Sequence, residues 1–203
     1  MSYVDEVLAK VKIEDVNDIV SIHCSAFKGF FLTSLGPQFL KLYYTCFIKS
    51  NETITMVAED EGRILGFSAS TRVCKGFNRR LIKSNLFDFG LLSLKMLFTN
   101  PISLLRLVKN LTKKGDSVED NEEYAELYSI GVSKDAQGMG IGKKLLAESE
   151  RIMKTEGIER VSLTTDYYDN EQTVGFYNSM GYETLYEFVT YPNRKMYRLI
   201  KTL

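Results

Sequence analysis

Three glycines at alternate positions, Gly138, Gly140 and Gly142, stand between a strand-like run at 125–132 and a helical run at 141–153. Glycine has no Cβ, so backbone N–H groups can converge there and an oxygen-rich group can approach closely. A helix that begins at such a turn adds its N-terminal dipole and its unpaired N–H groups. The spacing therefore predicts a site for a phosphate or pyrophosphate group.

Two common phosphate-binding loops fit this stretch poorly. A Walker A loop requires Gly-Lys-Ser/Thr, whereas Gly142 is followed by Lys143 and Lys144. A dinucleotide-binding loop has the longer spacing G-x-G-x-x-G near the start of a βαβ unit. The glycines here are more closely spaced and occur late in the chain, so neither nucleotide-binding class is predicted.

The elements that must position this turn follow from the periodicity of apolar residues. Strands are expected at 7–13, 53–58, 64–69, 125–132, 160–166, 182–191 and 195–200. Helices are expected at 15–27, from Gly36-Pro37 to about residue 47, at 141–153 and from 170 to 179. This order predicts an α/β (α+β) domain with a mixed sheet, and a single domain spanning 1–203.

A helical insertion, at about 76–118, precedes the central strand. It is rich in Leu and Phe, has helical periodicity and is interrupted at Asn100-Pro101, which predicts two or three helices. Residues 72–114 contain ten basic side chains and one acidic side chain, Asp88. Three interpretations stay open: a cover over the sheet with solvated lysines, a lid that attracts an anionic acceptor, or a peripheral membrane contact.

Composition excludes several functional classes. The 203 residues carry 26 basic and 26 acidic side chains, so no chain-wide charge favours nucleic acid. The three cysteines form no CxxC pair, and the single histidine offers neither a zinc cluster nor a catalytic triad, so no metal is expected. Charges near the N-terminus and the lack of an apolar run of about 18 residues predict a cytoplasmic protein without a membrane span.

A resemblance to a known family rests on two motifs. The segment from Val132 to Gly142 is similar to the Q/R-x-x-G-x-G/A signature of the GNAT N-acetyltransferase superfamily. Downstream, Asn170, Tyr177 and Gly181-Tyr182 have the spacing of that family's second pattern. The resemblance is strongest over 124–183 and excludes the insertion. It implies a twisted, mostly antiparallel sheet of about seven strands flanked by helices, with a helical insertion before the central strand.

The resemblance also implies where acetyl-CoA, as co-substrate, would bind. Its pantetheine arm would pair with the central strand, and its pyrophosphate would lie on the glycine turn. Asn170 matches an asparagine that contacts the cofactor. The implied cofactor-binding residues are Ile130, Gly131, Val132, Gln137, Gly138, Met139, Gly140, Ile141, Gly142, Lys143 and Asn170.

Acetyl transfer from a thioester to an amine needs a proton for the departing sulfur and a base for the amine. Tyr177 matches the family's tyrosine beside the sulfur, and a phenol with a pKa of about 10 stays protonated at neutral pH. Glu126 resembles a strand-borne glutamate that serves as base in some members, with His23 or an ordered water as alternatives. Other members have a glutamate on the next strand, where this chain has Thr165.

The implied function is transfer of an acetyl group from acetyl-CoA to a primary amine of a small molecule by direct attack. The loop at 26–36 and the insertion are similar to GNAT proteins of surface-polysaccharide synthesis, which suggests a nucleotide-linked amino sugar as acceptor. Phe27, Phe30 and Phe31 in this loop would border the acceptor pocket or pack in the core. A catalytically inactive CoA-binding module and a protein or peptide N-acetyltransferase are the alternatives, and either a monomer or a homodimer is compatible.

Overall fold

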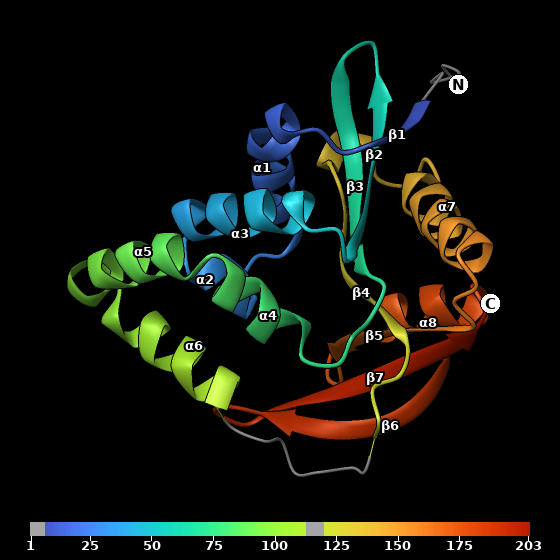
Figure 1. Ribbon diagram of the computed structural model, residues 1–203. Coiled ribbons are helices and arrows are strands. Elements are labelled where there is room, and N and C mark those ends of the chain that lie inside the picture. Colours follow the sequence, from blue (N-terminus) through green and yellow to red (C-terminus); the bar gives the residue numbers. More distant parts are fainter. Residues whose placement is uncertain (1–6, 113–119) are drawn as a thin grey trace.

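The computed structural model describes residues 7–112 and 120–203, which form a seven-stranded sheet flanked by helices (Figure 1). The strand order is β1-β2-β3-β4-β5-β7-β6. The predicted mixed sheet of about seven strands is thereby confirmed. The strands are β1 (Val7–Lys10), β2 (Thr53–Asp60), β3 (Arg63–Thr71), β4 (Ala125–Val132), β5 (Arg160–Asp166), β6 (Glu183–Thr190) and β7 (Arg194–Thr202).

Strands β4 and β5 are parallel, and the other neighbouring pairs are antiparallel. The pairing of β4 with β5 covers only Ala125 to Leu127. On its other edge β4 stays paired with β3 as far as Val132, with an irregularity that leaves Tyr128 outside the register. Extra residues of this kind bend a strand and increase its twist. The sheet therefore divides between β4 and β5 beyond Leu127.

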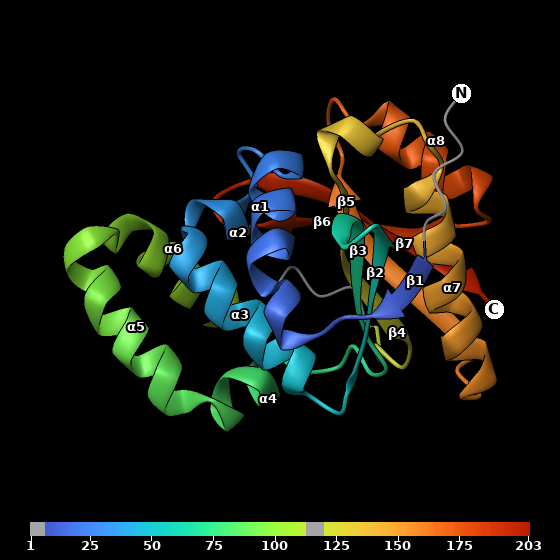
Figure 2. The same cartoon turned by 90° about the horizontal axis from the view of Figure 1, so that it is seen from above.

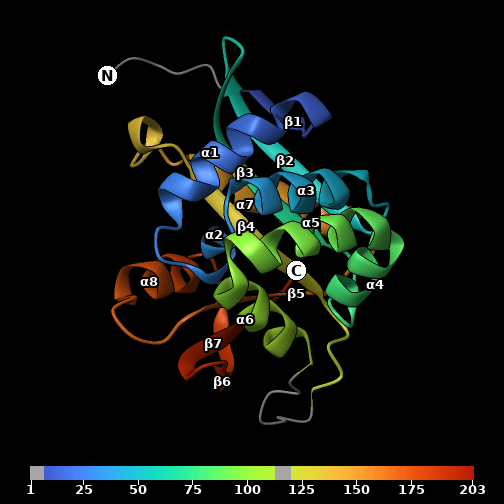
Figure 3. The same ribbon diagram turned by 90° about the vertical axis from the view of Figure 1, so that its left-hand side faces the viewer.

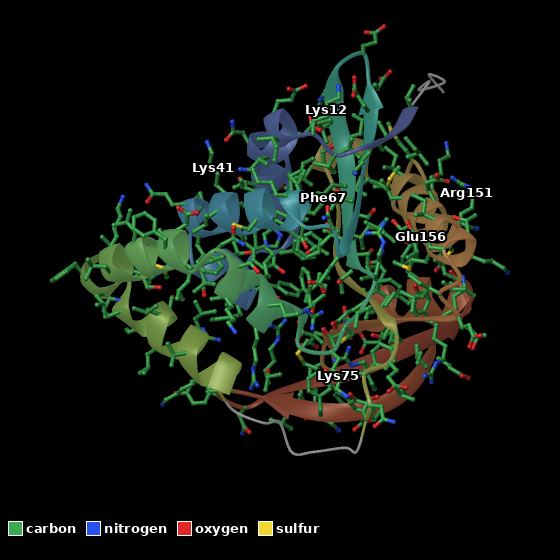
Figure 4. All side chains as sticks on the ribbon, viewed as in Figure 1. Lys12, Lys41, Phe67, Lys75, Arg151 and Glu156 are labelled. Atoms are coloured by element: carbon green, nitrogen blue, oxygen red, sulfur yellow. The ribbon has the colours of Figure 1, made fainter. Side chains whose placement is uncertain are left out.

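Two layers of helices cover the sheet. Helices α1 (Val16–Ala26) and α3 (Pro37–Lys49) pack on one face, and α7 (Ile141–Thr155) lies on the other (Figures 1 and 2). On the first face Phe67 lies between the sheet and α3 (Figure 4). It is buried, and its ring meets that of Tyr44 edge-on. On the second face Leu146 of α7 shares a core with Tyr177 of α8 (Glu171–Ser179).

The insertion forms three helices, α4 (Phe77–Ser84), α5 (Leu86–Thr99) and α6 (Pro101–Thr112). The predicted break at Asn100-Pro101 separates α5 from α6. Phe89 and Met96 attach α5 to the core that contains α3. The end of the predicted insertion, at 113–118, lies outside the described residues, and the assignment of the whole chain to one domain stays a prediction.

Two local predictions for the N-terminal half of the chain differ from the structure. The first strand ends at Lys10 rather than at Ile13, because Lys12 N–H donates to Asp15 Oδ2 at 2.7 Å and a 3₁₀ turn (Ile13–Asp15) follows. The segment predicted as a turn after residue 27 contains a short helix, α2 (Phe31–Ser34). Thr33 stabilises it by donating its hydroxyl to Phe27 O at 2.7 Å.

Candidate functional site

The division of the sheet opens a cleft of about 820 Å³ between β4 and β5. Its walls come from β4 and β5, from α8, and from the segment that joins α1 to α2, with Arg194 and Met196 of β7 at one side. The cleft is lined by both backbone edges and aromatic side chains, so it can hold an elongated ligand with polar and apolar parts.

The glycine turn lies at one end of this cleft, and Gln137 and Gly142 line it. Gly138 and Gly140 have φ values of 81° and 80°, which side chains rarely tolerate. Helix α7 begins at Ile141 directly after the turn, so its first N–H groups have no partner within the helix. The predicted strand–turn–helix arrangement for an anion is therefore present at the cleft.

The other residues of the turn differ in what they can contribute. The side chain of Ile141 is fully buried in the core under α7, while Met139 is 49% exposed. Neither of these two side chains lines the cleft. The side chain of Lys143 is exposed in the first turn of α7. The N–H of Met139 donates to Ala136 O at 3.4 Å, whereas Ile141 and Lys143, in the first turn of α7, can offer backbone N–H groups. Lys143 can also add a positive charge.

The floor of the cleft is the outer half of β4, where Ile130, Gly131 and Val132 all line it. One edge of this stretch pairs with β3. The other edge, on the side of β5, is unpaired beyond Leu127. A Cβ on Gly131 would lie 2.9 Å from Phe67 Cε1, so only glycine fits between the cleft and the core. The free edge can accept an extended chain by strand-like pairing.

Asn170 and Tyr177 approach the cleft from α8. Asn170 directly precedes this helix, and its amide donates to Thr165 Oγ1 at 2.7 Å and to Asp166 O at 2.8 Å, which fixes its orientation. Tyr177 is only 7% exposed and packs edge-on against Tyr182. Burial raises the pKa of Tyr177, so its hydroxyl stays protonated at neutral pH.

Glu126 lies on β4, where this strand still pairs with β5. Its side chain is buried and accepts hydrogen bonds from Arg198 Nη1 and Cys74 Sγ, each at 2.8 Å. Arg198 also donates to Ser162 Oγ at 3.1 Å. Glu126 is not among the described residues that line the cleft, and its carboxylate belongs to a buried ion pair. Its assignment as a base stays a prediction.

The cleft also contains groups that the sequence pattern did not reveal. Arg194 forms an ion pair with Asp166 and lies over the ring of Phe30, 4.7 Å from its centroid. These three residues come from β7, β5 and the segment before α2, so their meeting depends on tertiary structure. A basic residue directly after the turn at Pro192-Asn193 was the only local signal for Arg194.

His23 also lines the cleft, together with Phe27 and Phe31. For these two phenylalanines the sequence left either a pocket or a core position open. Its Nδ1 shares a hydrogen bond of 2.8 Å with Tyr44 Oη. Burial lowers the pKa of His23 to about 4, so the imidazole is neutral at pH 7. Over the described residues no group of His, Cys, Asp and Glu side chains could hold a metal ion.

Comparison with known proteins gives matches to one family. The model of the acetyltransferase (GNAT) family matches residues 16–182. The mycothiol acetyltransferase of Saccharomonospora viridis is 38% identical over 66 residues, which are 32% of this chain and 21% of that protein. The 5-NmdU N-acetyltransferase of Pseudomonas phage PaMx11 is 41% identical over 56 residues, 28% of this chain and 37% of the relative. The matched segments therefore cover about a fifth of the first relative's length and somewhat over a third of the second relative's length.

Several solved structures have a similar fold, and the similarity covers almost the whole chain. The PaiA N-acetyltransferase of Thermoplasma acidophilum, in complex with coenzyme A, superposes with a TM-score of 0.60 at 17% identity and full coverage of both chains. The ribosomal-protein-alanine N-acetyltransferase of Brucella melitensis gives a TM-score of 0.61 at 14% identity, covering 97% of this chain and 99% of the other. At these identities the likeness concerns the fold. Because the family model matches most of the sequence, this chain belongs to the acetyltransferase (GNAT) family.

Proposed function

We propose that the protein transfers an acetyl group from acetyl-CoA to a primary amine of a small molecule, without an acyl-enzyme intermediate. The observation that carries this proposal is that one cleft joins three features: the glycine turn, the free edge of β4 and the buried phenol of Tyr177. These features match the three parts of the co-substrate that need recognition, namely a pyrophosphate, an amide-containing arm and a thioester.

The residues around the cleft fit acetyl-CoA. The backbone N–H groups between Gln137 and Lys143 would hold the pyrophosphate, because positive φ at the glycines and the helix dipole both favour an anion there. Residues 130–132 would pair with the pantetheine arm. Asn170, already oriented by Thr165, would contact the cofactor near the start of α8.

The proposed reaction requires few groups from the protein. The amine nitrogen attacks the carbonyl carbon of the thioester, a C–N bond forms, and the C–S bond breaks to release the thiolate of coenzyme A. Tyr177 would donate its proton to this sulfur, because its raised pKa keeps the hydroxyl protonated until the thiolate departs. Backbone N–H groups on the free edge of β4 would stabilise the oxyanion.

The amine must also lose a proton, and Glu126 is our proposed acceptor of it. The carboxylate is paired with Arg198 below the cleft, so it would act through an intervening water molecule rather than by direct contact. Water alone is the competing route. The substitution Glu126→Gln, which keeps the shape of the side chain, distinguishes the two routes by its effect on turnover.

For the acceptor we propose a small-molecule amine, with a nucleotide-linked amino sugar as the specific candidate. The names of the relatives, mycothiol acetyltransferase and 5-NmdU N-acetyltransferase, support a small-molecule or nucleotide amine. Phe30 and Phe31 offer flat apolar surfaces at the acceptor end of the cleft, and Arg194 and Asp166 offer hydrogen-bonding groups. These groups suit a polar ligand that carries a ring.

The proposed activity is tested by incubating the protein with acetyl-CoA and a panel of amines, amino sugars and peptides while following the release of free thiol. We expect Tyr177→Phe to lower turnover about 100-fold at unchanged affinity for acetyl-CoA. The matched control is Tyr197→Phe, which removes a hydroxyl from a tyrosine outside the cleft.

Equal turnover by Tyr177→Phe would remove this residue from the role of acid. Tight binding of acetyl-CoA without turnover on any amine would instead identify a binding module that has lost catalysis. Turnover on peptides alone would identify a protein or peptide N-acetyltransferase.

A further inference from the structure

Helices α5 and α6 lie at the outer edge of the molecule (Figures 1 and 3), and both carry exposed apolar side chains. Phe87 is 82% exposed and Phe98 is 85% exposed, which is unusual for residues in ordered helices. We call the group the outer apolar face, and it consists of Leu86, Phe87, Leu91, Leu94, Leu97, Phe98, Ile102 and Leu105.

Four of these residues are aligned by their spacing on α5. Residues 87, 91, 94 and 98 recur at intervals of four, three and four, so their side chains lie along one side of the helix. Phe89 and Met96 occupy the opposite side and are buried, with the Phe89 ring packed against Phe39 of α3. Helix α5 is therefore apolar on both sides, a composition typical of helices that are covered all round.

The outer apolar face is not needed to attach the two helices to the protein. Where α5 meets α6, Asn100 Nδ2 and Ser103 Oγ donate to Ser34 O at 2.9 and 3.1 Å. Farther along α6, the guanidinium of Arg106 lies over the ring of Phe31, 5.3 Å from its centroid. The inner side thus holds the hairpin in place, and the outward side chains are available for another partner.

The charge of this region selects the kind of partner. Residues 77–112 carry six basic side chains, Arg79, Arg80, Lys83, Lys95, Arg106 and Lys109, and one acidic side chain, Asp88. Arg80 forms an ion pair with Glu52, and the other five basic side chains still outnumber Asp88. A second copy of the chain placed on this face would bring two positively charged regions together, which is unfavourable. An anionic lipid surface complements both properties, because it attracts basic residues and accepts apolar side chains at the boundary of its acyl chains.

We propose that the outer apolar face is a peripheral binding site for anionic membranes, with α5 and α6 lying in the plane of the interface. Over the described residues no helix is long and apolar enough to cross a bilayer. Binding at the surface therefore accounts for the exposed apolar residues in these helices. The inference does not depend on the proposed acetyl transfer.

The test is co-sedimentation of the full chain with phosphatidylcholine vesicles that contain or lack phosphatidylglycerol. We expect binding to the anionic vesicles, weakening as ionic strength increases. The double variant Phe87→Ser/Phe98→Ser should lower the partition coefficient at least about tenfold, because two large side chains no longer enter the lipid. A matched pair is Leu91→Ser on this face and Leu185→Ser on β6, where only the first should weaken binding.

Far-ultraviolet circular dichroism and urea unfolding confirm that each variant is folded. Absence of binding to anionic vesicles would overturn the proposal. Equal weakening by Leu91→Ser and Leu185→Ser would overturn it as well. Vesicle-independent dimers that dissociate in the double variant, seen by sedimentation velocity, would show that a second copy covers the face instead.

Discussion

The buried ion pair between Glu126 and Arg198 allows a quantitative prediction about what this carboxylate does. Arg198 Nη1 and Glu126 Oε1 are 2.8 Å apart, and the two side chains are 10% and 9% exposed. The substitution Arg198→Met keeps much of the apolar length of the side chain but removes the positive charge. It leaves the carboxylate of Glu126 with only uncharged neighbours, the thiol of Cys74 and the phenol of Tyr128, among the described residues.

Removing one partner of a buried ion pair costs about 3–5 kcal/mol, because the remaining charge is desolvated without compensation. For a chain of this size the corresponding loss of melting temperature is on the order of 10 °C. Replacement of both partners by apolar residues of similar volume, Glu126→Leu with Arg198→Met, is expected to change stability by less than either single substitution. The two substitutions should therefore couple by at least about 2 kcal/mol.

Unfolding by urea, followed by circular dichroism, measures all three variants against the wild type, and an unchanged m-value shows that the unfolded state is comparable. Strictly additive effects, or a loss of less than about 1 kcal/mol in Arg198→Met, would refute the reasoning. The same proteins separate the two roles of Glu126. If the double variant is stable and keeps its turnover, the carboxylate is a structural partner of Arg198 and not the base.

Two further predictions concern residues beside the cleft. Between about pH 6.5 and 4 the unfolded chain protonates His23 while the native chain does not, so wild-type stability falls as pH decreases through this window. In His23→Gln the fall in the free energy of unfolding across this window should be smaller by about 2–3 kcal/mol. Urea unfolding at a pH on either side of the window measures it, and an unchanged pH dependence would contradict the prediction. Gly131→Ala should cost about 1–3 kcal/mol, because its Cβ would lie 2.9 Å from Phe67. Gly142→Ala, with its nearest contact at 3.7 Å from Val132, is the control, and equal losses would refute this reason.

The strand–turn–helix unit from β4 to α7 was predictable because its signals are local. Alternating residues, glycines at special φ values and a helical stripe follow each other directly in the sequence. The order of strands was harder to derive, since β7 lies between β5 and β6 and no local pattern specifies this insertion. The sequence therefore located the glycine turn but not the groups that β7 brings to the site.

Arg198 and Arg194 illustrate the consequence. Each pairs with a carboxylate on a strand far away in sequence, Glu126 and Asp166, because β7 runs next to β5. In the sequence Glu126 follows a group of acidic residues at 119–123, whereas the structure surrounds its side chain with Arg198 and Cys74. The burial of His23 was hidden for a similar reason, since a lone histidine on a helix gives no sign of its partner Tyr44.

The central claim, that the glycine turn holds acetyl-CoA, is tested most directly by calorimetric titration of two matched variants. Gly140 and Gly157 have φ values of 80° and 79°, and an added Cβ meets nothing within 4 Å at either position. Gly140 precedes α7 at the turn, whereas Gly157 follows the other end of the same helix. Alanine should therefore introduce similar backbone strain at both sites, about 1–2 kcal/mol.

Wild type and Gly157→Ala are expected to bind acetyl-CoA with equal affinity. Gly140→Ala should bind at least about tenfold more weakly, because a shifted turn misplaces N–H donors to a charged group. Equal affinities in all three proteins, or no binding of acetyl-CoA by the wild type, would contradict the account.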